Sequence, residues 1–129
     1  MRGHRDERGS TSVVETVLIA PVLFAIVMMI VQFALVAHAR SVAEAAAQEG
    51  ASAGRAVGGT SAEARARADH YVASLGPRML ADRRIDVEMT DESVTVTVSG
   101  DVVSLVPWVA PSIAETASGP RERYVPPEP

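Results

Sequence analysis

The sequence predicts an α+β membrane protein in which a long N-terminal transmembrane helix continues into a stalk. A second, short helix then leads to a small antiparallel β-hairpin or three-stranded meander. Three observations support this prediction: an apolar run from Val17 to Ala37, an Ala-rich stretch after it, and an alternating apolar pattern beginning at Ile85. We expect a cytoplasmic leader over 1–9, a transmembrane helix and stalk over 10–58, a small extracytoplasmic α/β domain over 59–118, and a disordered tail over 119–129.

The composition excludes several classes of function. The net charge of −4 argues against a nucleic-acid partner, because phosphate contacts need a concentrated basic surface. The chain has no cysteine, so it forms no disulfide, thiolate metal site or thiol-based active site.

The apolar run is long enough to cross a bilayer once. Its 21 residues would extend about 31 Å as a helix, close to the hydrocarbon thickness of a membrane. A cleaved secretory signal is the competing interpretation, because Ala37-His38-Ala39 has a small-x-small form and cleavage there would release the chain from Arg40 onward. The run exceeds the usual length of a signal core, which favours the span.

The charged residues before the run indicate its orientation in the membrane. Basic residues precede it at Arg2, Arg5 and Arg8, which favours a cytoplasmic N-terminus.

Gln32 is strongly polar and lies deep in the run, where we expect it to bond to a neighbouring helix or to reach the outer interface.

Gly9, Ser10, Glu15 and Pro21 form the most informative pattern in the chain. A carboxylate at a membrane edge requires a nearby cation or access to water. The segment from Arg8 to Pro21 resembles the N-terminus of TadE-like proteins, the minor pilins or pseudopilins of tight-adherence pilus systems, in which a Pro follows the Glu by six positions. Glu15 and Pro21 keep that spacing.

The resemblance implies a processing site and a set of partners. A prepilin peptidase would cut after Gly9, leaving Ser10 as the new N-terminus and an amine for Glu15 to pair with. Such a cut makes Glu15 the sixth residue, whereas the family places Glu fifth, and a cut after Ser10 would restore the fifth position. The implied partners are the membrane, pilins, other TadE-like subunits and the pilus platform proteins.

The stalk contains glycines at a regular spacing. Gly50, Gly54 and Gly58 recur every four residues, a spacing that allows close approach of another helix in apolar surroundings. Polar neighbours weaken that interpretation, and we favour a helix that frays toward Gly58.

A capping box at Thr60 and Glu63 predicts a second helix that ends at Gly76-Pro77. The predicted apolar stripe of this helix comprises Ala64, Ala68, Tyr71 and Leu75. Two predicted intrahelical ion pairs, Glu63 with Arg67 and Arg65 with Asp69, describe a solvated outer face.

The next segments alternate with the period of a strand. Apolar residues at 85, 87 and 89 and then at 94, 96 and 98 flank Asp91-Glu92, which predicts a hairpin with one buried face. A third strand is expected over 112–117. Trp108 in the preceding loop is predicted to anchor that loop on the core, with a partner subunit or the membrane surface as the alternatives.

We expect no catalysis, cofactor, metal or small-molecule substrate. The histidines, His4, His38 and His70, lie in separate segments and form no metal-binding pattern. The predicted function is that of a TadE-like minor pilin or pilus-assembly protein in the inner membrane or a surface pilus. The alternative is an uncut, single-pass membrane anchor that carries an extracytoplasmic binding or sensor module.

Overall fold

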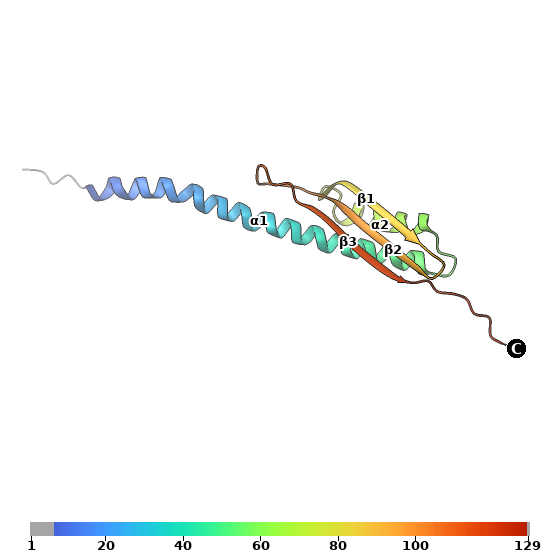
Figure 1. The fold of residues 1–129 in the computed structure, drawn as a ribbon. Helices are drawn as coiled ribbons and strands as arrows, with labels where there is room; N and C mark the ends of the chain where they lie inside the picture. The colour runs from blue at the N-terminus through green and yellow to red at the C-terminus, as the bar shows by residue number, and fades with distance from the viewer. Residues whose placement is uncertain (1–6, 129) are drawn as a thin grey trace, which may run out of the picture.

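The computed structural model describes residues 7–128, with side chains from Ser12 onward. It contains two helices, α1 (Glu7–Arg55) and α2 (Ser61–Leu75), followed by three strands, β1 (Leu80–Met89), β2 (Ser93–Val102) and β3 (Ser112–Pro120) (Figure 1). The predicted α+β class, with a long N-terminal helix, a second short helix and an antiparallel sheet, is therefore confirmed. Arg2 and Arg5 of the leader lie outside the described residues.

Helix α1 is unusually long because nothing in its sequence stops it before residue 55. Its 49 residues correspond to about 74 Å, and it continues without interruption through Pro21. It ends at Arg55, and Gly58 in the following turn has φ +80°, a conformation that favours glycine.

The glycines inside α1 serve packing, so the favoured interpretation of fraying is wrong at Gly50 and Gly54. Both are buried within the helix. A Cβ at Gly50 would lie 2.8 Å from the carbonyl oxygen of Ala64, and one at Gly54 would lie 2.9 Å from Cγ2 of Val94. Any side chain at these positions would push α2 or the sheet away from α1.

Helix α2 begins as its sequence predicts. The Thr60 side chain accepts a hydrogen bond from the Glu63 N–H, and the Glu63 carboxylate accepts one from the Thr60 N–H. The buried stripe differs from the prediction in the last two turns, because Val72 is buried together with Ala64 and Ala68, whereas Tyr71 is only partly buried and Leu75 is exposed.

The charged residues of α2 form ion pairs with other elements rather than within the helix. Arg67 pairs with Glu49 of α1 at 3.2 Å, and Asp69 pairs with Arg83 of β1 at 2.9 Å. The predicted intrahelical pairs are therefore wrong, since both Arg67 and Asp69 have partners on neighbouring elements.

The sheet has the order β1-β2-β3 with antiparallel neighbours. The predicted hairpin is confirmed, and its register pairs Ile85 with Val98 and Met89 with Val94. The predicted third strand is also confirmed, extending to Pro120. One face of β2 is fully buried through Val94, Val96 and Val98, while Thr97 bonds Thr116 of β3 on the other face at 2.9 Å.

The core lies between one face of this sheet and the two helices. The two helices pack extensively against each other, and on the sheet α1 packs against β2 and β3 whereas α2 packs against β1. The second half of α1 contributes a small-residue face that lets the helix sit close to its neighbours; the buried members are Ala39, Val42, Ala43, Ala46, Ala47 and Ala51. The stalk half of α1 therefore belongs to the same core as the sheet.

Two expectations near the C-terminus need correction. Trp108 is 95% exposed, so it does not anchor its loop on the core. The tail starts later than predicted, because the Arg121 N–H donates to the Glu92 carbonyl and the Glu122 N–H donates to the Arg55 carbonyl, both at 2.9 Å.

Candidate functional site

The predicted site residues all lie on the first part of α1. Gly9 and Ser10 belong to the helical backbone that begins at Glu7, and Glu15 and Pro21 follow on the same helix. Glu15 is exposed, and among the residues whose side chains are described it takes part in no ion pair or side-chain hydrogen bond. The processing role of Gly9 and Ser10 and the assembly role of Glu15 and Pro21 stay predictions.

Beside Glu15, the hydroxyl of Thr16 forms a hydrogen bond with the backbone of the same helix. The Thr16 hydroxyl donates to the Ser12 carbonyl at 2.8 Å, the bond by which a hydroxyl is accommodated on an apolar helix. Glu15 is therefore the conspicuous charge at this end of the apolar surface.

An apolar surface without any covering element dominates the first half of α1. From Ser12 to Val31 every side chain is exposed except Met28, which is partly buried. Only 6% of the most apolar window is buried, whereas the core helix of a soluble protein is mostly buried. These 20 residues extend about 30 Å, so α1 is long and apolar enough to span a membrane.

Gln32 marks the end of that surface. Its side chain is 4% exposed, its Nε2 donates to the Val103 carbonyl at 3.2 Å, and its Oε1 accepts from the Leu105 N–H at 2.7 Å. The sequence predicted a bond to a neighbouring helix or a position at the outer interface, and the side chain instead bonds the β2–β3 loop of the same chain. Both the nitrogen and the oxygen of this buried side-chain amide therefore have hydrogen-bond partners, as buried polar groups in proteins usually do.

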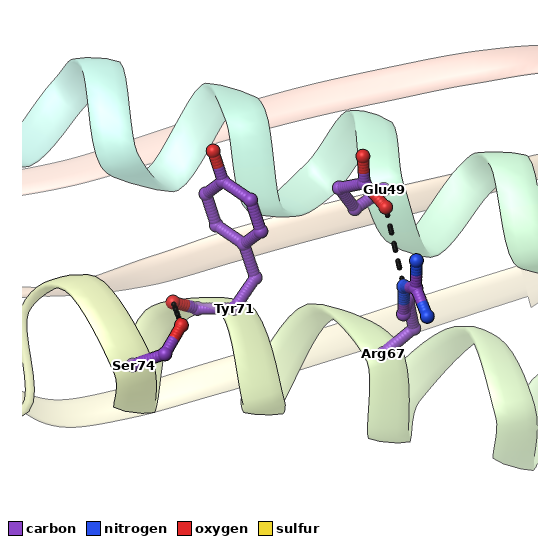
Figure 2. Close-up of polar contacts among 4 residues, drawn as sticks. All are labelled: Glu49, Arg67, Tyr71 and Ser74. Atoms are coloured by element: carbon purple, nitrogen blue, oxygen red, sulfur yellow. Dashed lines mark hydrogen bonds and ion pairs between the residues drawn. The ribbon is translucent and has the colours of Figure 1, made fainter.

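One ion pair joins α2 to the second half of α1 (Figure 2). The Arg67–Glu49 ion pair crosses between the two helices, and the ring of Tyr71 points from α2 toward α1. The Ser74 hydroxyl donates to the Tyr71 carbonyl at 2.9 Å. Because both members of the ion pair are substantially exposed, it orients α2 more than it stabilises the domain.

The described part of the chain holds no cluster of three or more metal-ligating side chains. His38 lies on α1 and His70 lies on α2, and His4 lies outside the described residues.

Two features of this region were missed by sequence reasoning. The hydrogen bonds of Gln32 join residues 71 and 73 positions apart, which no local pattern reveals. The exposure of Trp108 had no local signal either, because the uncharged stretch from Val102 to Pro111 fits a buried loop as well as an exposed one.

Comparison with known proteins identifies one family. Residues 9–52, about a third of the chain, match the family described as TadE-like protein. The match confirms the resemblance first seen at Glu15 and Pro21, and it extends from the helix start into the buried half of α1. No curated protein and no solved structure gave a significant match.

Proposed function

We propose that this chain, whose residues 9–52 carry the TadE-like family segment, is a minor pilin or pilus-assembly protein held in the inner membrane by α1. Its N-terminus lies in the cytoplasm and its α/β domain lies outside. Its partners are pilins, other TadE-like subunits, the pilus platform and the prepilin peptidase. The role is structural and involves no catalysis or cofactor.

The observation that carries this proposal is the uncovered apolar surface of α1 within the family segment. A helix that is apolar all round is stable when lipid or other apolar helices surround it. The rest of the described chain leaves residues 12–31 exposed, so both environments remain available to them. A protein that moves between a membrane and a helical filament core needs such a surface.

In this proposal, the Glu15 carboxylate forms an ion pair with an N-terminal amine that processing creates. A charge at the centre of a membrane helix costs roughly 2.5–3.5 kcal/mol on insertion scales, a charge nearer the edge such as Glu15 costs less, and pairing with a cation offsets the cost. After a cut at Gly9, the Ser10 amine would lie about 7.5 Å from the Glu15 backbone along the helix axis. Pairing of Glu15 with this amine, or with the amine of a neighbouring subunit, would link assembly to processing.

Substitution of Glu15 tests the assembly role. We expect Glu15→Ala to insert into the membrane normally and to be depleted several-fold from the sheared pilus fraction, as quantified by immunoblot in the native host. Glu44→Ala is the matched control, since Glu44 is an exposed carboxylate on the same helix. Normal incorporation of Glu15→Ala would sink the proposed role of this carboxylate.

A further inference from the structure

The β2–β3 loop, residues 103–111, reaches back from the sheet along α1 toward its N-terminal half (Figure 1). The two hydrogen bonds from Gln32 fix the loop beside the helix, and the Val103 N–H donates to the Met79 carbonyl at 3.4 Å. The loop thus lies at the level of Gln32, the first buried side chain after the exposed stretch 12–31, and Phe33 beside it is 70% exposed.

The chemistry of this loop is unusual for a surface segment. It carries no charge, and its large side chains are exposed: Val103, Leu105, Trp108 and Val109. Trp108, at 95% exposed and with φ +59°, projects from the loop without contact to the core. A contiguous exposed apolar patch marks an interaction surface.

A groove next to the loop extends this patch. About 820 Å³ of open space lies between α1 at Val31 and Leu35, the α2–β1 turn at 75–79, and the loop at Val103 and Leu105. Its lining is mostly apolar, and Arg78 is the one charged residue that lines it. Leu75, which the sequence placed in the core, is exposed at this rim.

We propose that this end of the domain, termed the membrane-side surface and made of residues 75–79 and 103–109, lies in the boundary between headgroups and acyl chains of the leaflet nearest the domain. Trp108 is the interfacial anchor, the groove holds a phospholipid acyl chain, and Arg78 faces the phosphate. The inference rests on the proposed span of α1, and it adds a second membrane contact that would fix the tilt and rotation of the domain.

The position of the surface favours lipid over a protein partner. If residues 12–31 cross the hydrocarbon, Gln32 lies at its edge and the loop beside it lies at the same depth. Trp is enriched at this depth because its ring is apolar and its N–H is polar. Several loop backbone groups have partners within the chain, including the Val103 carbonyl, the Leu105 N–H and the Val109 N–H, which lowers the cost of leaving water.

The single tryptophan of the chain makes the proposal directly measurable. The full chain is reconstituted in phosphatidylcholine vesicles containing lipids brominated near the carbonyl end or near the methyl end of the acyl chain. We expect Trp108 fluorescence to be quenched several-fold more strongly by bromine near the carbonyl end, and to be protected from aqueous iodide.

Val109→Glu provides the perturbation, and Val57→Glu provides a matched control at the other end of the domain, where Val57 is also exposed. Val109→Glu should raise iodide quenching of Trp108 several-fold, whereas Val57→Glu should leave it unchanged. Circular dichroism of both variants checks that the fold is retained.

The outcomes separate this inference from the proposed anchor. Free access of iodide to Trp108 in protein that still floats with alkali-washed vesicles would overturn the membrane-side surface alone. Protection from both iodide and bromine would mean a protein contact and would also overturn it. Release of the chain by alkali would overturn the span and this inference together.

Discussion

Gln32 separates the two halves of α1. Before it, the described side chains are mostly apolar and all exposed except Met28, and from Ala39 onward one face of the helix is buried in the α/β core. Its amide bonds the loop through both its nitrogen and its oxygen, so the contact needs that functional group in that orientation. A leucine at this position would fill a similar volume, but it would leave the Val103 carbonyl and the Leu105 N–H without their hydrogen-bond partner.

Replacement of Gln32 tests this contact. We expect Gln32→Leu to lower the free energy of unfolding by about 1–3 kcal/mol, since the Leu105 N–H and the Val103 carbonyl lose their partner. Denaturant unfolding in detergent micelles gives the stability, and amide exchange at Leu105 should accelerate.

Gln48→Leu is the control, because Gln48 is exposed and bonds only Glu44 at 3.4 Å. Equal stability of Gln32→Leu and the parent chain would show that the loop does not depend on the amide.

Single residues were predicted well where their role depends on near neighbours. The Thr60–Glu63 capping box is such a case, because its two bonds span three residues. The roles of Gln32 and Trp108 depend on where the β2–β3 loop lies relative to α1, a contact between residues more than 70 positions apart that no local pattern reveals.

At the scale of the elements, the close contact between α1 and α2 depends on two glycines of α1, which have no side chain to keep the helices apart. Gly50 and Gly54 lie one turn apart, and both would place a Cβ against Ala64. Their spacing allowed close approach in the sequence, but their polar neighbours Ser52 and Arg55 argued for fraying. The structure resolves this because the polar residues lie on the exposed side of the same helix.

Gly50→Ala distinguishes packing from fraying by the sign of its effect. In a fraying helix, Ala would stabilise by about 1 kcal/mol through helix propensity. In this structure the new Cβ would lie 2.8 Å from the Ala64 carbonyl oxygen, so overpacking of about 1–3 kcal/mol should dominate.

Thermal and denaturant unfolding measure the change, and Ser52→Ala on the exposed side of α1 should stay near the parent value. A more stable Gly50→Ala chain would contradict the close approach.

The elements that the sequence predicted best have strong local patterns. Alternation fixed the buried face of the hairpin, and the observed register pairs the predicted apolar residues with one another. The stripe of α2 was wrong at Leu75, since Val72 is buried in the core whereas Leu75 in the last turn is exposed. Which residues of a helix are buried depends on the neighbours that the helix packs against.

At the scale of the whole molecule, one helix joins an uncovered apolar surface to a small folded domain. The described C-terminal residues lie at the end of the domain opposite the exposed apolar stretch (Figure 1). In the proposed arrangement, the first half of α1 contacts lipid or other helices, and the second half holds α2 and the sheet at a fixed height above the membrane.

The mass of the mature N-terminus in protein extracted from native membranes tests this account most directly. A minor pilin cut by a prepilin peptidase should begin at Ser10, or at Thr11 if the cut restores Glu15 to the fifth position. An intact Met1 would contradict the pilin assignment and favour the uncut anchor, and a start at Arg40 would contradict the membrane anchor itself.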